Sequence, residues 1–199
     1  MEFGIENLWA MLLGYVLGSI PFGLLLTSMA GMGDVRKIGS GNIGATNVLR
    51  TGNKGLAAAT LLLDLFKGFL PVFLAWRYLG ETSVGFAALA AVIGHCFPVW
   101  LKFRGGKGVA TLAGVCFGIA WPIGLVYAAV WIGLLALLRI SSLAGMAAAV
   151  SAPVAALLTG YGQFAPYLAV IAALIMWLHR ANISRLRAGT EPKVGGSAT

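Results

Sequence analysis

Long apolar runs, separated by short polar or glycine-rich segments, follow one another along the whole chain. A membrane-spanning helix needs about 20 mostly apolar residues to cross roughly 30 Å of hydrocarbon. The runs that match or approach this length cover residues 8–31, 56–76, 84–101, 109–121, 123–138, 143–159 and 164–178. The pattern therefore predicts an all-α, polytopic membrane protein with seven transmembrane helices, organised as a single integral membrane domain over residues 1–199.

The run at residues 109–121 is shorter than a typical span, so an alternative with six spans has to be weighed. If Pro122 kinks the chain, residues 109–138 form one bent helix. The basic residues favour seven spans, with the N-terminus outside and the C-terminus in the cytoplasm. Of the 14 Lys and Arg residues, Arg77 then lies outside and Lys67 within a span, and the other 12 face the cytoplasm. Six spans would move Arg139 and the basic tail to the outer side, against the positive-inside rule.

The composition agrees with a membrane protein and excludes an ordinary soluble one. Hydrophobic residues make up 59% of the chain and charged residues only 10%, against about 45–50% and about 25% in soluble domains. The net charge of +8 is explained by membrane orientation and by attraction to anionic membrane lipids. No nucleic-acid partner is therefore expected.

The three most polar, glycine-rich segments lie at residues 34–54, 102–111 and 179–193. With seven spans, all three fall on the cytoplasmic side, whereas the outer connections are short and nearly uncharged. We therefore expect the functional site at the cytoplasmic surface.

The first of these segments has the ingredients of an anion-binding loop. Its glycines allow backbone N–H groups to turn toward an anion. The polar side chains around them are Ser40, Asn42, Thr46, Asn47 and Arg50. The alternative is a solvated loop at the level of the lipid headgroups.

The second segment places three cations among three glycines directly before a predicted helix. Flexible backbone donors, fixed positive charge and a helix N-terminus together favour a phosphate ligand. The residues concerned are Lys102, Arg104, Gly105, Gly106, Lys107 and Gly108. The alternative is a basic anchor of the positive-inside kind, although an anchor has no need of the glycines.

The third segment presents a histidine and an amide together. At helical spacing His179 and Asn182 share one face, so both emerge at the end of the last span. The alternative for His179 is a histidine that reaches from the span end to the membrane interface.

Ionisable residues inside the predicted spans are candidates for structural support. Asp64 and Lys67 lie at i and i+3 of one span and can pair there. His95, near the end of the third span, and Glu191, in the third segment, are placed in the same class.

The three segments together resemble one family of enzymes. The strings are GSGNIGATNVLRTGNKG at residues 39–55, FPVWLKFRGGKGVAT at 97–111 and HRANISRLRAGTE at 179–191. They are similar to the three motifs of the bacterial acyl-phosphate:glycerol-3-phosphate acyltransferases, a family of seven-span membrane enzymes. The similarity extends over nearly the whole chain.

This resemblance implies an acyltransferase of phospholipid synthesis. The enzyme would transfer a fatty acyl group from acyl phosphate to the sn-1 hydroxyl of glycerol 3-phosphate, giving lysophosphatidic acid and phosphate, without a cofactor or metal. It would lie in the bacterial cytoplasmic (inner) membrane, its active site would face the cytoplasm, and an acyl-phosphate-forming enzyme would hand over the donor. Both substrates carry phosphate, which fits the cationic, glycine-rich segments.

Within this resemblance the candidate residues take distinct roles. His179 and Asn182 are expected to polarise the carbonyl or to position the hydroxyl, and Ser40 to orient a substrate or, less favourably, to form a covalent intermediate. Lys107 and Arg50 are expected to hold phosphate, aided by the backbone at 105–108. The remaining candidates for substrate or phosphate binding are Asn42, Thr46, Asn47, Lys102 and Arg104.

A second function from a different class is a small transporter of an anionic phosphorylated metabolite. It would use the same cations, and it would give a role to ionisable residues at depth. Against it, the polar residues concentrate on one face and not near the midplane of the membrane.

Overall fold

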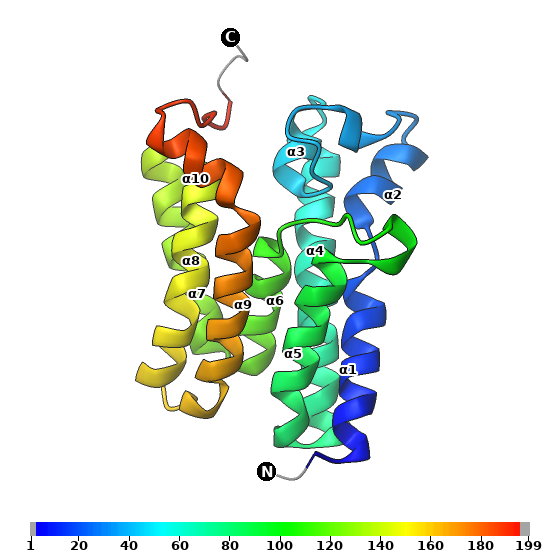
Figure 1. Cartoon of the computed structure of the whole chain (residues 1–199), viewed down its shortest axis with the longest axis vertical. Helices are drawn as coiled ribbons and strands as arrows, with labels where there is room; N and C mark the ends of the chain where they lie inside the picture. Colours follow the sequence, from blue (N-terminus) through cyan, green and yellow to red (C-terminus); the bar gives the residue numbers. More distant parts are fainter. Residues whose placement is uncertain (1–2, 196–199) are drawn as a thin grey trace.

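The computed structural model describes residues 3–195, and this range contains helices and loops but no strand. The long helices run side by side and form one bundle (Figure 1). They are α1 (Ile5–Gly18), α4 (Lys54–Leu74), α5 (Glu81–Cys96), α6 (Val109–Ile119), α7 (Trp121–Leu138), α8 (Ser141–Leu158) and α9 (Ala165–Leu178). The short helices α2 (Phe22–Met29), α3 (Ala45–Leu49) and α10 (Arg180–Arg187) lie at the end where the C-terminus emerges.

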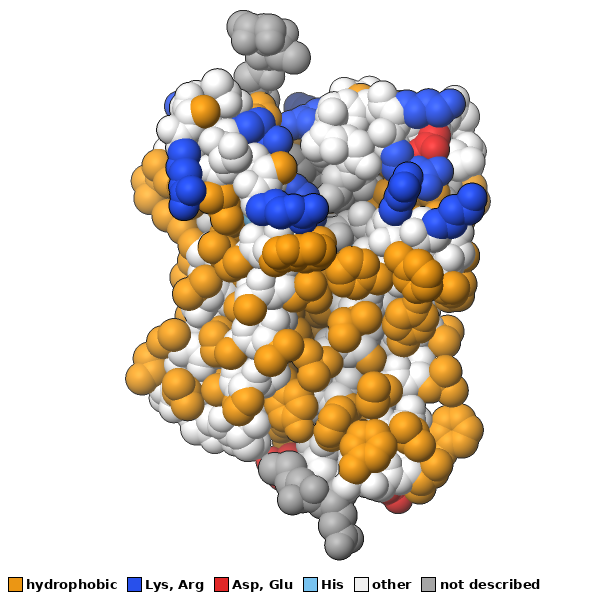
Figure 2. Space-filling model, in the orientation of Figure 1, with side chains coloured by type: hydrophobic (Ala, Val, Ile, Leu, Met, Phe, Trp, Pro, Cys, Tyr) orange, Lys and Arg blue, Asp and Glu red, His pale blue; other side chains and the backbone are white. Residues whose placement is uncertain are grey.

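The chain is an integral, multi-pass membrane protein. Five helical segments of the described residues are long and apolar enough to cross a membrane, and α9 with α10, bent by 59°, makes a sixth. Helix α6 is also apolar but has only 11 residues, which corresponds to a length of about 16 Å. Hydrophobic side chains cover the middle of the molecule, and Lys and Arg side chains gather at one end (Figure 2).

The first predicted span is not one continuous helix. Helix α1 ends at Gly18, and α2 begins at Phe22. Pro21 lies in the break, where it has no N–H to continue a helical ladder. The Ile20 carbonyl instead accepts a hydrogen bond from Nζ of Lys67 at 2.7 Å. The predicted span over residues 8–31 corresponds to the candidate span Ile5–Met29, within which the helix is broken at Pro21.

Helix α5 ends at Cys96, inside a candidate span that continues to Leu101, where the predicted third span also ends. Pro98 follows, and the chain turns back on itself. The N–H groups of Gly105 and Gly106 then donate to the carbonyls of Cys96 and His95, at 3.0 Å each. The loop thus provides donors for the last carbonyls of α5, which a helix terminus leaves unpaired.

Helices α6 and α7 are separate, so residues 109–138 do not form one bent helix. The Tyr127 hydroxyl donates to the Val109 carbonyl at 2.8 Å, whereas 18 residues of a straight helix would separate these positions by about 27 Å. The chain reverses at Ala120, which has an extended conformation with φ −161° and ψ 133°. The two helices therefore pack antiparallel.

Close approach between helices depends on glycines at the contacts. A Cβ atom at Gly18 would overlap the backbone of Ala91 on α5, and a Cβ atom at Gly114 would overlap the carbonyl of Leu65 on α4. Small residues at helix contacts are typical of membrane bundles, because they let backbones approach. The bundle so formed holds the three polar segments at one end (Figure 1).

Candidate active site

The second and third polar segments meet at a lysine. Lys107 precedes Gly108, the N-cap of α6, and its Nζ donates a hydrogen bond to Oδ1 of Asn182 on α10. Gly108 has a φ of 83°, a left-handed conformation that favours glycine. This contact joins residues that are 75 positions apart in the chain and places a cation beside the N-terminus of α6.

A carboxylate orients the amide that Lys107 contacts. Glu191 accepts hydrogen bonds from Ser142 at 2.6 Å, from Nδ2 of Asn182 at 2.5 Å and from Nε of Arg185 at 2.6 Å. Because Nδ2 of Asn182 is held by Glu191, its Oδ1 is left to face Lys107. The network therefore fixes the direction of the amide, and with it the position of the lysine.

Replacing Glu191 with Gln should lower the thermal stability of the protein in a pH-dependent way. Burial opposes ionisation of Glu191, but hydrogen bonds from Ser142, Asn182 and Arg185 outweigh burial and lower its pKa. A carboxyl whose pKa is lowered by folding stabilises the protein above the pKa of its unfolded form, and it loses this effect as pH falls through the folded value. We expect Glu191→Gln to cost about 1–3 kcal/mol at neutral pH.

The measurement is the unfolding midpoint in detergent between pH 3 and pH 8. The gap between the two proteins should close at the acid end, where the wild-type carboxyl is protonated as well. Glu81→Gln is the matched control, because Glu81 is exposed and has one hydrogen bond, to Gln163. A gap of equal size at all pH values would contradict the assigned role of the charge.

His179 lies at the bend between α9 and α10, and one of its ring nitrogens has no hydrogen bond to any residue from 3 to 195. Its Nδ1 lies 2.8 Å from the carbonyl oxygen of Ile175, and since a carbonyl only accepts, Nδ1 carries the proton. The unprotonated nitrogen is then Nε2. Burial lowers the pKa of His179 to about 4, and the charge of Lys107 acts in the same direction, whereas the hydrogen bond to Ile175 opposes both. At neutral pH the ring is therefore an uncharged hydrogen-bond acceptor.

The first segment is folded around one buried amide. Nδ2 of Asn47 donates to the carbonyls of Val35, Ile38 and Asn42 at 2.9, 3.0 and 2.8 Å. Its Oδ1 accepts from the backbone N–H of Ser40 at 3.1 Å. The side chain of Asn47 is hydrogen-bonded within the loop on both its nitrogen and its oxygen, so it organises the segment.

The other residues of the first segment remain near its surface. Arg50 lies against Gly39, where an added Cβ would come within 2.6 Å of Nη1. The Thr46 hydroxyl is 3.0 Å from that of Ser141, at the start of α8. Ser40 Oγ donates to Asn47 at 3.4 Å, and within residues 3–195 it has no hydrogen bond to a histidine. The geometry thus does not support Ser40 as a nucleophile activated by a neighbouring base.

The loop at residues 105–108 offers fewer backbone N–H donors for a phosphate than the sequence predicts. The N–H groups of Gly105 and Gly106 already donate to the end of α5, which removes them as phosphate donors. Lys102 and Arg104 are exposed, unlike Lys107. Among the described residues of this loop, the backbone N–H groups of Lys107, Gly108 and the first turn of α6 donate to no backbone carbonyl.

Ser141, Ser142 and Arg185 join the site without having been predicted. Ser142 is buried and contacts Glu191, whereas Ser141 contacts Thr46. In the sequence, the signal that could have indicated Ser141 and Ser142 is a pair of hydroxyl side chains at the start of an apolar helix. Their relation to the other segments depends on tertiary packing, which the pattern along one helix does not reveal.

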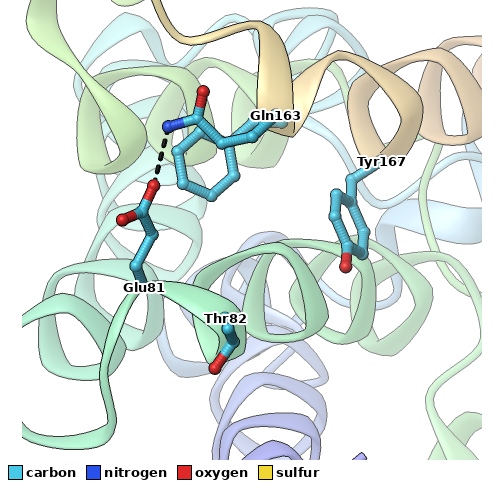
Figure 3. A pocket seen from close by; sticks show the side chains of 5 residues that line it. Glu81, Thr82, Gln163 and Tyr167 are labelled. Atoms are coloured by element: carbon cyan, nitrogen blue, oxygen red, sulfur yellow. Dashed lines mark hydrogen bonds between the residues drawn. The ribbon is translucent and has the colours of Figure 1, made fainter. Parts of the chain in front are cut away.

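A separate hollow lies at the opposite end of the bundle, between the starts of α5 and α9. Figure 3 shows Glu81 and Gln163 joined across it by a hydrogen bond of 2.8 Å, with Thr82 and Tyr167 nearby. None of the predicted site residues lines this hollow. The candidate active site is therefore the cationic end and not this pocket.

The chain is similar to enzymes of one kind. Residues 8–189 match the sequence model of a family described as glycerol-3-phosphate acyltransferase. The glycerol-3-phosphate acyltransferases of Erythrobacter litoralis and Novosphingobium aromaticivorans are each 66% identical to this chain over 195 residues, which covers 98% of this chain and 98% of each relative.

Two solved structures resemble the fold closely. The glycerol 3-phosphate form of PlsY (YgiH), an integral membrane glycerol 3-phosphate acyltransferase, is 39% identical, with a TM-score of 0.89 over 95% of this chain and 96% of that chain. The lysophosphatidic acid form of PlsY is 38% identical, with a TM-score of 0.87 over 94% of each chain.

Proposed function

Because the chain belongs to the glycerol-3-phosphate acyltransferase family, we propose that it acylates the sn-1 hydroxyl of glycerol 3-phosphate with acyl phosphate as donor. The products would be lysophosphatidic acid and inorganic phosphate. This deepens the family assignment by naming the donor and the position of acylation. The supporting observation is the contact of Lys107 with Asn182, at the cationic end where an uncharged His179 also lies.

The proposed transfer is a direct displacement at the acyl carbon. The glycerol hydroxyl oxygen forms a bond to the carbonyl carbon, the bond from this carbon to the phosphate oxygen breaks, and phosphate leaves. Lys107 and Arg50 hold phosphate groups and neutralise the charge on the leaving group. The hydroxyl proton passes to Nε2 of His179 or to a phosphate oxygen of the substrates. Asn182 positions the reacting groups, which contributes through proximity.

The proposed topology has seven spans, with the N-terminus outside and the C-terminus in the cytoplasm. The segment from α1 to α2 and the helices α4 to α9 would each cross once, so that the cationic end of Figure 2 faces the cytoplasm of a bacterial inner membrane. A site at this surface suits a donor with a lipid chain and a water-soluble acceptor. We further propose that the donor is handed over by an acyl-phosphate-forming enzyme.

The transporter alternative loses its main argument. It relied on ionisable residues at depth, but Asp64 and Lys67 lie 2.7 Å apart and pair with each other. The family is one of acyltransferases, which favours the enzyme over the transporter.

The decisive test is phosphate release from purified protein in lipid supplied with palmitoyl phosphate. We expect release that depends on glycerol 3-phosphate, is accompanied by lysophosphatidic acid, and does not occur with acyl-CoA as donor. A well-folded sample that uses acyl-CoA in place of acyl phosphate would overturn the proposed donor, and acylation at the other hydroxyl would overturn the proposed position.

A further inference from the structure

A buried group of ionisable side chains lies below the active site. Nζ of Lys67 is 2.7 Å from Oδ1 of Asp64, and Nδ1 of His95 lies 3.9 Å from the same oxygen. The three side chains are only 2–4% exposed. An ion pair so deep is costly unless its remaining contacts are also satisfied. Its contacts lead to two of the segments that form the site.

The first contact leads to the segment that contains Arg50. Lys67 donates to the Ile20 carbonyl in the break before α2, and its Nζ lies 5.7 Å from the centre of the Phe22 ring. Helix α2 in turn packs tightly on this segment, because a Cβ atom at Gly23 would overlap the Ile43 carbonyl. The ion pair therefore supports the base of the first segment.

The second contact leads to the loop that contains Lys107. The imidazole of His95 occupies the place that a Cβ atom on Gly106 would need: the three heavy atoms nearest to such a Cβ all belong to this ring. The φ of Gly106 is not in the left-handed region, so its backbone would accept alanine. The ring of His95 thus leaves no room for a side chain at residue 106. Lys107 is the next residue in the chain.

We propose that His95 is a positioning residue for Lys107, its ring packed between the Asp64–Lys67 ion pair and Gly106 of the loop. The imidazole determines how closely the loop approaches α5. The position of the loop in turn determines where Nζ of Lys107 lies relative to Asn182. This inference rests on the proposed function of the site, since it assigns the cluster to the binding of a phosphate group by Lys107.

The test uses alanine at His95 and at Gly106, singly and together. These changes leave no buried charge without its partner, unlike changes at Asp64 or Lys67. Gly106→Ala should raise the KM of one phosphate substrate about tenfold, and His95→Ala should raise the same KM by about three- to tenfold, with kcat less affected. In the His95→Ala background, Gly106→Ala should add little, because the methyl group occupies the space left by the ring.

Gly105→Ala is the matched control. A Cβ atom there would meet the carbonyl oxygens of His95 and Cys96, which the His95→Ala change does not remove. Its effect should therefore be the same in both backgrounds. Ser83→Ala, in the same helix and equally buried but hydrogen-bonded to Asn7, should lower stability without changing KM.

Binding is also followed without catalysis, through the shift of the unfolding midpoint by glycerol 3-phosphate and by inorganic phosphate. A wild type that is stabilised by phosphate but transfers no acyl group would overturn the proposed function alone. Equal penalties for Gly106→Ala in the two backgrounds would overturn the inference. So would a His95→Ala protein that loses stability but keeps both KM values, or one that changes the KM of a different substrate from that changed by Lys107→Met.

Discussion

Replacing Lys107 with Met should lower kcat/KM for acyl transfer roughly 30- to 150-fold, the equivalent of about 2–3 kcal/mol for a charged hydrogen bond to phosphate. Burial lowers the pKa of Lys107, as does the charge of Arg185, whereas Glu191 opposes both. A partly desolvated ammonium gains more from a bound dianion than a solvated one does, because its own solvation is already reduced. Met keeps most of the aliphatic side chain, so the loss reports the charge and not the packing.

The matched controls are Lys102→Met and Arg104→Met in the same loop. Both side chains are exposed, and exposed charges contribute little to local binding energy because solvent and salt screen them. Initial rates are measured with both substrates varied, and we expect the controls to remain within about threefold of the wild type. If Lys107→Met left both KM and kcat intact, or if the controls lost as much as Lys107→Met, the phosphate site would be wrongly assigned.

The membrane architecture was largely predictable because hydrophobic periodicity is a local property. The all-helical fold and the pairing of Asp64 with Lys67 at i and i+3 both follow from neighbours in sequence, and both are present in the structure. The hydrophobic pattern did not reveal two helix breaks inside the predicted spans, both at prolines: the break at Pro21 and the end of α5 before Pro98. In each case apolar residues continue past the point where the helical hydrogen bonds stop.

The site was predictable in its residue types but not in its hydrogen bonds. Glycines next to Lys107 suggested a cradle of N–H donors, yet Gly106 serves close packing against His95, which lies 11 positions earlier in the chain. Asn47, a candidate for substrate binding, has hydrogen bonds to the carbonyls of its own loop that the sequence did not predict. A short polar side chain can donate to a ligand or to a nearby carbonyl equally well, so only the folded backbone decides between these partners.

Replacing His179 with Ala should lower kcat about 10²–10⁴-fold if its Nε2 accepts the hydroxyl proton. The ring has the geometry of an acceptor, because Nδ1 is engaged by Ile175. In the free enzyme, however, a pKa of about 4 makes His179 a weaker base than a phosphate monoester, whose second pKa is about 6. Bound phosphate dianions would raise the pKa of the imidazole, since nearby negative charge favours its protonated form.

Two further measurements distinguish the proton acceptors. His179→Gln retains a hydrogen-bond acceptor but cannot take up a proton, so a return to within about tenfold of wild type would assign His179 to orientation and the proton to the substrate phosphate. In the wild type, the acid limb of kcat/KM reports the free enzyme and free substrate, and should include a step near pH 4 that is absent in His179→Ala. Loss of less than tenfold in His179→Ala, with that step unchanged, would exclude a catalytic proton transfer at this residue. The acceptor would then be the phosphate that Lys107 and Arg50 hold, and catalysis would rest on proximity and charge alone.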